Sequence, residues 1–299
     1  MIKPVSFTEK LLFSTIRIEA LLADGQRSVG TAFFFDARLD ENRHLPLIVT
    51  NKHVVKDAVE GIIQLHEAEG EGNEIRPSGR HFEARINNFA GHWIGHPNES
   101  IDLCAMPFQP MRDKLQKNGK RIFNLSFDES LVFSDLQLET LSAVENVLMV
   151  GYPTGLWDEK NNLPLFRRGI TSTHPAIDFC GKPIFLIDAA AFPGSSGSPV
   201  VFADMGFYQD KMGNTSIGTS RIALLGVLYA GPMWTAEGSV EVDPIPTAVL
   251  PMSRTNVMIH LGYVLKAKEI LALSSHIVRE ANKGLLRDKM IIFRDCQFA

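Results

Sequence analysis

The chain has 299 residues, of which 45% are hydrophobic and 21% charged, a balance typical of a folded globular protein. Its formal net charge of -4 and the lack of a basic cluster argue against a nucleic acid as partner. Three widely spaced cysteines, Cys104, Cys180 and Cys296, indicate neither a disulfide framework nor a zinc site, so we expect no metal and no cofactor. The start lacks the apolar core of a secretory signal, and no apolar run of about 18 residues could span a bilayer, so we expect a cytoplasmic protein without a membrane partner.

The first third of the chain has the pattern of a β-structure. Residues 11–36 contain two strand-like runs around a turn, which predicts a hairpin. The apolar run 45–50 predicts a short buried strand that ends just before His53. Residues 67–80 are acidic and glycine-rich, which predicts a solvated hairpin loop.

Two histidines at 92 and 96 raise the question of a metal pair. On a strand they would share one face about 13 Å apart. No further ligand residues accompany them, so a metal site there is disfavoured.

The segment 109–146 has the weakest pattern, with a short helix predicted at 110–117 and ended by Asn118-Gly119. A polar insertion occupies 203–220. Strand-like runs are predicted at 147–151, 184–190, 199–202, 222–230 and 259–265.

Residues 266–283 carry apolar side chains at helical spacing, with Gly284 in a stop position. We expect this helix to pack against the strands of the second half of the chain; the alternative is an amphipathic helix that binds a partner. No role follows from the sequence for the tail 284–299.

One serine, Ser196, has a glycine two residues before it and another directly after it in Gly194-Ser195-Ser196-Gly197-Ser198-Pro199. Glycine reaches backbone angles that other residues avoid, so such a turn can expose a hydroxyl beside several convergent N–H groups. That combination suits acyl transfer. The alternative is an ordinary Gly/Ser-rich turn between two strands.

Two upstream residues favour the catalytic interpretation of Ser196. His53 follows a buried strand, and Asp102 lies within a second apolar segment. A serine hydroxyl needs a histidine to take its proton and a carboxylate to orient that histidine. The order His, Asp, Ser and the serine at position 198 exclude the G-x-S-x-G elbow of α/β-hydrolases. Taken alone, His53 would be interpreted as a core residue.

These segments resemble the signatures of trypsin-like (chymotrypsin-fold) serine peptidases, over roughly residues 12–275. The three signature segments are Thr50-Asn51-Lys52-His53-Val54, Ile101-Asp102-Leu103 and Gly194-Ser195-Ser196-Gly197-Ser198-Pro199. Further segments are similar to the bacterial HtrA/Deg branch: Asp188-Ala189-Ala190, Gly151-Tyr152-Pro153, Arg168-Gly169-Ile170-Thr171-Ser172 and Leu225-Gly226-Val227.

The resemblance implies an all-β fold of two six-stranded antiparallel β-barrels with a C-terminal α-helix, forming a single peptidase domain over 1–299. Its parts would be a first barrel at about 11–108, a link at 109–146, a second barrel at 147–265, the helix at 266–283 and a tail at 284–299. Because this tail is short, we expect none of the PDZ domains that HtrA proteins append.

The resemblance also implies residue roles. His53 would be the base, Asp102 its orienting acid and Ser196 the nucleophile, in a serine endopeptidase that acts on protein or peptide substrates. The oxyanion hole would be formed by the N–H groups of Gly194 and Ser196, with Ser195 between them. The residues expected at the substrate are Ala190, Ala191 and Phe192 in the pocket and Leu228, Tyr229 and Ala230 along the wall.

Three departures from the secreted trypsins refine these expectations. Ser195 replaces an aspartate, so activation by a new N-terminal amine is not expected. Ala190 offers no counter-ion at the pocket floor, which favours a small or medium apolar residue before the cut. Ser198 stands at a position usually occupied by glycine.

Two other functions stay open at this stage. The protein could be a catalytically silent double barrel that binds peptides or scaffolds, or an enzyme switched on by an activating partner protein. A cysteine hydrolase based on Cys104 or Cys180 is disfavoured, because neither cysteine lies in a glycine-flanked turn.

Overall fold

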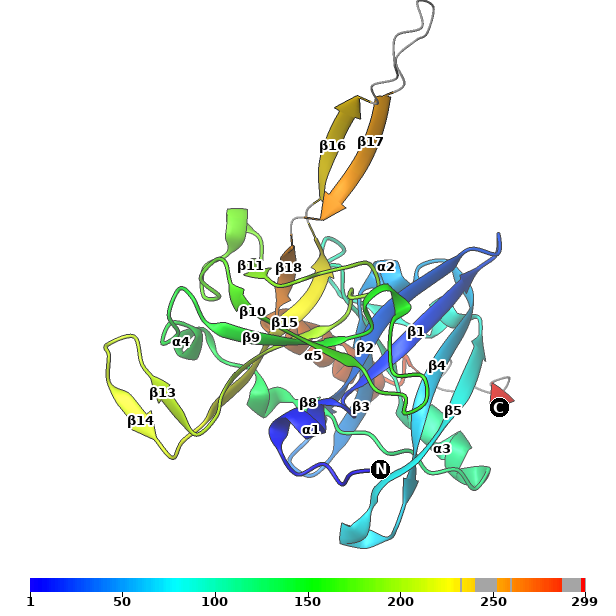
Figure 1. Cartoon of the computed structure of the whole chain (residues 1–299). Coiled ribbons are helices and arrows are strands. Elements are labelled where there is room, and N and C mark those ends of the chain that lie inside the picture. Colours follow the sequence, from blue (N-terminus) through cyan, green and yellow to red (C-terminus); the bar gives the residue numbers. More distant parts are fainter. Residues whose placement is uncertain (232, 240–251, 259, 287–296, 299) are drawn as a thin grey trace, which may run out of the picture.

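A computed structural model describes residues 1–231, 233–239, 252–258, 260–286 and 297–298 of the chain. These residues form two β-rich halves side by side, with one long helix, α5 (Lys268–Asn282), behind them (Figure 1). Nine strands of the first half belong to one sheet, and six strands of the second half close into a barrel.

The sheet of the first half has the strand order β19-β5-β4-β1-β2-β3-β7-β6, with β8 paired in parallel to β2. Its longer strands are β1 (Thr15–Leu22), β2 (Arg27–Arg38), β3 (His44–Thr50), β4 (Ala58–Glu69), β5 (Arg76–Asn87) and β7 (Cys104–Pro107). Three strands have two residues each: β6 (Ile94–Gly95), β8 (Phe127–Asp128) and β19 (Gln297–Phe298). The predicted hairpin is confirmed, since β1 and β2 pair antiparallel across a turn in which Gly25 has a φ of +85°.

The closed barrel of the second half has the strand order β10-β11-β18-β15-β12-β9. Its strands are β9 (Asn146–Gly151), β10 (Leu165–Thr171), β11 (Ile184–Asp188), β12 (Pro199–Asp204), β15 (Arg221–Ala230) and β18 (Leu261–Lys266). The predicted fold class, an all-β protein with a C-terminal helix, is confirmed. The first half differs from the expected six-stranded barrel. Among the described residues its strands form an open sheet of nine, because three two-residue strands add to the six that were expected.

Helix α5 covers the seam between the halves. Its apolar face, formed by Ile270, Leu273 and Ile277, is at most 1% exposed. These side chains share one core cluster with Phe33 of β2 and Val201 of β12. Burying each such side chain contributes about 1.5–3 kcal/mol. The expected packing of this helix on the second half is confirmed by its contact with β18, and the helix also contacts β2 and β7 of the first half, which the sequence did not indicate.

The link between the halves starts with α3 (Gln109–Lys117), as predicted. The helix ends at Asn118, and Gly119 follows with a φ of +71°, a backbone angle that favours glycine. A 3-10 turn, η3 (Glu129–Leu131), and a short helix, α4 (Asp135–Leu138), complete the link.

The loop predicted at 67–80 is shorter than expected, because β4 and β5 extend into it and leave only 70–75 as a turn around η1 (Gly72–Glu74). Two ion pairs explain why the acidic residues tolerate a strand. Arg76 pairs with Glu69 at 2.8 Å, and Arg80 pairs with Glu67 at 2.7 Å. Opposite charges facing each other across two strands stabilise the pairing.

His92 and His96 do not lie on one strand. His92 is the last residue of a 3-10 turn, η2 (Phe89–His92), and its Nε2 lies 3.1 Å from Asn87 O. His96 is buried with its Nε2 3.3 Å from Glu269 Oε2 of α5, and burial lowers its pKa. Within the described ranges, no group of three His, Cys, Asp or Glu side chains is placed to hold a metal ion.

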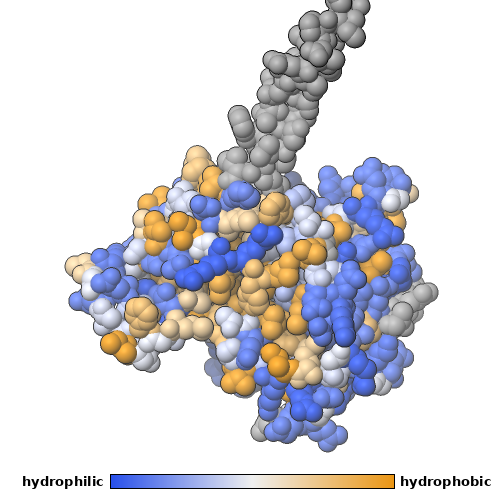
Figure 2. Space-filling view, in the orientation of Figure 1, coloured by the Kyte–Doolittle hydropathy of each residue, from blue (hydrophilic) through white to orange (hydrophobic). Residues whose placement is uncertain are grey.

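Two hairpins project from the second half (Figure 1). The predicted insertion at 203–220 contains β13 (Phe207–Gln209) paired with β14 (Thr215–Ile217), which exposes Phe207 and Ile217. Apolar atoms are visible there, whereas the surface over β4 and β5 is mostly hydrophilic (Figure 2). The second hairpin pairs β16 (Met233–Ser239) with β17 (Met252–Met258).

At the chain's end, β19 pairs with β5, while residues 287–296 and 299 of the predicted tail lie outside the described residues. Among the helices that the structure describes, none has the length and apolar character needed to cross a membrane.

Candidate active site

Strand pairing in the first half brings His53 and Asp102 together. β3 and β7 run antiparallel with Thr50 opposite Cys104, so the end of β3 lies beside the start of β7. His53 sits in the single helical turn α2 (Lys52–Val55) directly after β3, and Asp102 lies two residues before β7. The two side chains therefore meet at one edge of the sheet.

The contact between them is bidentate. His53 Nδ1 lies 2.5 Å from Asp102 Oδ2, and the His53 backbone N–H donates to Asp102 Oδ1 at 3.1 Å. Asn51 Nδ2 donates to the Asp102 backbone oxygen at 2.7 Å and fixes the acid's main chain. A carboxylate accepts hydrogen bonds, so it keeps the ring proton on Nδ1 and leaves Nε2 able to accept a proton.

Ser196 lies in the turn between β11 and β12. Gly194 and Gly197 both have a φ of +86°, which side-chain-bearing residues rarely adopt. A Cβ on Gly197 would overlap the backbone oxygen of Thr31, so the space also requires glycine. The Thr31 N–H donates to Ser196 O at 2.8 Å, which ties the turn to β2 of the first half.

Hydrogen bonds fix the direction of each peptide unit in this turn. The three carbonyl oxygens that precede Ser196 all accept hydrogen bonds: Pro193 O from Thr154 N–H, Gly194 O from Thr31 Oγ1 at 3.1 Å and Ser195 O from Ser198 N–H at 3.0 Å. In a trans peptide the N–H points away from the carbonyl oxygen. The N–H groups of Gly194 and Ser196 have no protein acceptor within the part of the chain that is described.

The middle residue of the predicted oxyanion hole has a different role. The Ser195 N–H donates to Phe192 O at 3.0 Å and is therefore occupied. The Ser195 side chain is buried, and its hydroxyl has no hydrogen-bond partner among the described residues. Ser195 thus shapes the turn, and the two free N–H groups on either side of it are the donors available to a ligand.

The hydroxyl of Ser196 points to the neighbouring strand. Its Oγ donates to Tyr229 O of β15 at 3.5 Å, a long hydrogen bond, and among the described residues it has none with His53. The structure thus joins His53 to Asp102 directly and places Ser196 at the seam through its backbone contact with Thr31.

A cavity of about 220 Å³ opens beside Ser196. It is lined by Ala191, Phe192, Pro193, Ser196, Leu228, Ala230 and Gly231. Four of the six substrate residues predicted from the sequence are among them. Ala190 does not line the cavity, and neither does Tyr229, because successive side chains of a strand point to opposite faces.

Among the described residues, none that lines the cavity is charged, in agreement with the uncharged pocket expected from the sequence. Two side chains that do not line the cavity contact its aromatic residue, Phe192. The Arg167 guanidinium lies 4.8 Å from the centre of the Phe192 ring, and the His260 ring packs edge-on with 5.9 Å between the ring centres. Pro193 and Gly231 were not predicted, although each directly adjoins a residue that was singled out in the sequence.

Cys104 and Cys180 are poorly placed for nucleophilic chemistry. Cys104 is fully buried, and burial raises the pKa of its thiol well above the usual value, which disfavours the reactive thiolate. Cys180 is exposed in a 3-10 turn, η5 (Phe179–Gly181), outside the cavity lining.

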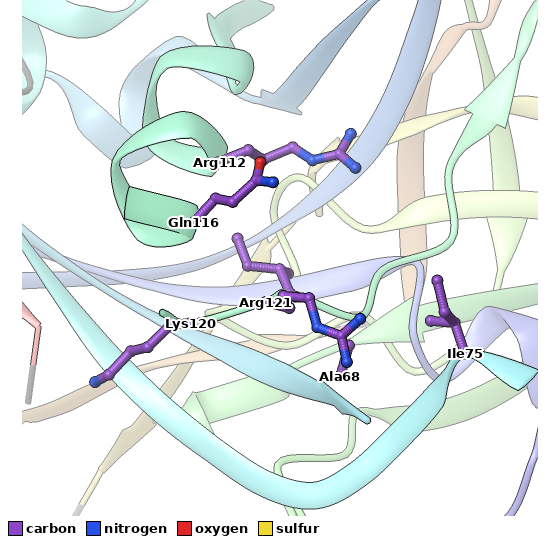
Figure 3. Close-up of a pocket in the computed structure, with 7 residues that line it drawn as sticks. Ala68, Ile75, Arg112, Gln116, Lys120 and Arg121 are labelled. Atoms are coloured by element: carbon purple, nitrogen blue, oxygen red, sulfur yellow. The ribbon is translucent and has the colours of Figure 1, made fainter. Parts of the chain in front are cut away.

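A second hollow, of about 190 Å³, lies away from these residues, between α3 and the β4–β5 hairpin (Figure 3). None of the residues predicted for the site lines it. Its lining residues are Ala68, Ile75, Arg112, Gln116, Lys120, Arg121 and Ile122.

The fold and the site together define a chymotrypsin-like peptidase domain. A family model described as the trypsin-like peptidase domain matches residues 30–206, and the chain belongs to this family. A comparison with curated proteins finds no match.

Solved structures with a similar fold include HtrA-type proteases. The active form of the Rv3671c protease from M. tuberculosis is 18% identical, with 90% of this chain and 82% of that chain covered and a TM-score of 0.42. The HtrA-type protease AlgW, solved with a tripeptide, is 15% identical, with 92% and 63% covered and a TM-score of 0.47. Deg5 is 17% identical, with 74% and 81% covered and a TM-score of 0.39.

Proposed function

We propose that the protein is a serine endopeptidase in which His53 and Asp102 activate Ser196. The observation that carries this proposal is the bidentate contact of His53 with Asp102, at 2.5 Å and 3.1 Å, in a chain of this family. It supports the proposal because a histidine whose Nδ1 proton is held by a carboxylate has its Nε2 free to act as a base.

In the proposed reaction, rotation about the Ser196 Cα–Cβ bond moves Oγ from Tyr229 O toward His53 Nε2. Nε2 takes the hydroxyl proton while Oγ attacks the peptide carbonyl carbon. The negative charge that develops on the carbonyl oxygen is stabilised by the N–H groups of Gly194 and Ser196, each of which is worth about 3 kcal/mol in such a site. The imidazolium then returns its proton to the leaving amine, and water hydrolyses the acyl-enzyme by the same route.

The end of β15 suits a peptide substrate. β12 begins at Pro199, opposite Val227, so on that side the residues beyond Leu228 have no partner strand among those described. An extended peptide can add to such an edge with main-chain hydrogen bonds. The residue before the cut then enters the uncharged 220 Å³ cavity, which favours a small or medium apolar side chain.

The experiment that tests the proposal compares wild type with Ser196→Ala, using casein cleavage and labelling by a fluorophosphonate probe. Ser172→Ala is the matched control, because Ser172 is an exposed serine just after β10 and does not line the cavity. We expect labelling and cleavage in wild type and the control, and neither in Ser196→Ala. Equal labelling of all three proteins would remove Ser196 from the proposed role.

One observation favours a partner-switched form of the same enzyme as the second candidate. The Ser196 hydroxyl is bonded to Tyr229 O rather than to His53, as in a resting state that a bound peptide must reorganise. Labelling of wild type that appears only after a peptide is added would favour this candidate. A protein that binds peptides but is never labelled would favour a silent scaffold.

A further inference from the structure

Thr31 of β2 is fully buried and lies where the two halves meet. Its hydroxyl accepts from the Tyr152 N–H at 3.0 Å and donates to Gly194 O at 3.1 Å. Its backbone N–H donates to Ser196 O at 2.8 Å, and its carbonyl accepts from Thr50 Oγ1 at 2.6 Å. One residue of the first half thus bonds two segments of the second, at Tyr152 and in the turn of Ser196.

We propose that Thr31 is a positioning residue for the oxyanion hole, a role that rests on the proposed peptidase function. Gly194 is one of the two glycines of the turn, and a glycine peptide needs outside contacts to fix its direction because glycine can adopt many backbone angles. Its carbonyl has one donor in the described chain, the Thr31 hydroxyl. That bond fixes the Gly194–Ser195 peptide, whose N–H donates to Phe192 O, and so restrains the two adjoining peptides, which carry the Gly194 and Ser196 N–H groups.

Few side chains could replace that of Thr31. The group must accept one hydrogen bond and donate another at the same time, which a hydroxyl does and a methyl group does not. The space around it is equally narrow, because a Cβ on Gly151 would come within 2.6 Å of Thr31 Oγ1. Serine keeps the hydroxyl, whereas valine keeps the shape and loses both hydrogen bonds.

The test compares Thr31→Val with Thr31→Ser and with the control Thr171→Val. Thr171 is also fully buried in a strand, and its hydroxyl also accepts from one backbone N–H, that of Glu145, and donates to one carbonyl, that of Ala143, each at 2.9 Å. It therefore reproduces the loss of two buried hydrogen bonds away from the turn.

We expect Thr31→Val to lower kcat by about 10- to 100-fold, less than the loss of a whole oxyanion donor, with KM nearly unchanged. Its affinity for a peptide boronic acid should fall by a similar factor. Thr31→Ser should restore kcat, and Thr171→Val should lower the unfolding temperature without this loss.

Equal kcat in wild type and Thr31→Val would overturn the positioning role, as would equal losses in the Thr31 and Thr171 valine variants. If Thr31→Val fails to fold, Thr31→Ala is measured against the same controls. Absence of any Ser196-dependent turnover in wild type would refute the peptidase proposal itself, so the two failures are distinguishable.

A second inference, independent of the first, concerns the hollow between α3 and the β4–β5 hairpin: it binds an organic anion. Arg112 of α3 and Arg121 lie on opposite sides of it, with the amide of Gln116 beside Arg112 and Ala68 and Ile75 on the far side (Figure 3). Arg121 Nη2 donates to Gly70 O at 2.7 Å, which holds this guanidinium against the hairpin turn. The site therefore combines two guanidinium groups with apolar walls.

Neither arginine forms a direct ion pair among the described residues, although the charge of Arg112 acts on the partly buried carboxyl group of Asp36. Glu69 and Glu67 of the adjoining hairpin are already paired, with Arg76 and Arg80 respectively. Lys120 is turned away, with its ammonium group 4.7 Å from the centre of the Phe82 ring. Guanidinium groups bind phosphate and carboxylate oxygens in bidentate fashion. We infer that the hollow takes a small organic phosphate or carboxylate whose apolar part lies on Ala68 and Ile75.

Calorimetric titration at constant ionic strength with phenyl phosphate, benzoate and inorganic phosphate tests this. We expect saturable binding of an aromatic anion, at least tenfold weaker in Arg112→Gln and Arg121→Gln, and unchanged in Lys117→Gln. Lys117 is an exposed lysine of α3 that does not line the hollow. Tighter binding of the phosphate or of the carboxylate identifies the head group. No saturable binding by wild type, or equal weakening in all three variants, would overturn the inference.

Discussion

Replacing Asp102 with asparagine gives the sharpest test of the proposed chemistry, because both carboxylate oxygens accept hydrogen bonds from His53. One is 2.5 Å from Nδ1 and the other 3.1 Å from the backbone N–H. An amide has one acceptor, so it can satisfy only one of these donors. The backbone N–H of His53 cannot lose its proton, whereas the imidazole can carry its proton on either Nδ1 or Nε2. The amide oxygen of Asp102→Asn should therefore face the backbone N–H, and its NH2 group should face Nδ1.

This arrangement moves the ring proton to Nε2, and His53 can then no longer take the proton of Ser196. A triad with the wrong tautomer loses roughly four orders of magnitude in kcat, equivalent to about 5.5 kcal/mol in the activation barrier. Stability should change little. The His53 side chain is 47% exposed and that of Asp102 is 27% exposed, and pairs in contact with solvent contribute about 1 kcal/mol or less.

The assay is kcat on a peptide p-nitroanilide with alanine or valine before the cleaved bond, together with urea denaturation of the same samples. We expect a large loss of kcat with a nearly unchanged unfolding midpoint. Asp102→Asn protein that is folded and retains turnover within tenfold of wild type would refute the argument from the tautomer. Asp204→Asn is the control, because Asp204 forms a comparable ion pair with Arg221 at 2.6 Å and does not line the cavity.

Other expectations concern stability and activation. Burial lowers the pKa of His66 to about 4, below the value of about 6.5 in the unfolded chain. The free energy of unfolding should therefore fall as the pH drops from about 6.5 toward 4, by at most about 1.4 kcal/mol per pH unit. In urea titrations, His66→Leu should flatten this dependence. Gly197→Ala should destabilise by at least about 3 kcal/mol, since it adds backbone strain to an overlap with Thr31 O, and an unchanged urea midpoint would contradict this. Deleting residues 1–5 should leave kcat unchanged, because Ser195 offers no acid to pair with a new N-terminal amine; a rise in kcat would show that such an activation exists.

The residues of the candidate site could be singled out from the sequence, because the proposed hydroxyl nucleophile requires few residue types in a recognisable setting. His53 follows an apolar run, and Ser196 lies between two glycines whose positive φ angles the structure shows. Five of the six barrel strands could also be predicted, since each contains an apolar run, whereas β10 carries Arg167 and Arg168 and was not predicted. The contact of Asp102 with His53 then follows from the pairing of β3 with β7, which the two apolar segments made plausible.

The other features of the fold and of the site depend on contacts between segments that are distant in the sequence. Neighbouring residues in the sequence do not indicate such contacts. A buried threonine such as Thr31 has the pattern of a strand residue, and nothing near it in sequence indicates that its hydroxyl meets Gly194, 163 residues later. His96 reaches Glu269 of α5 in the same way. The extension of β4 and β5 into the predicted loop depends on cross-strand ion pairs that become visible only once the register is known.

Contacts between the two halves matter for the proposed activity because the residues of the candidate site come from both halves. His53 and Asp102 stand on the sheet of the first half, and Ser196 stands on the barrel of the second, so neither half holds the three groups alone. Their spacing depends on what crosses the seam: the bonds of Thr31 on one side and the apolar face of α5 on the other. A displacement of about 1 Å between reacting groups can cost about 100-fold in rate. Variants at the seam should therefore lose turnover before they lose the fold, whereas core variants within one half should lose both together.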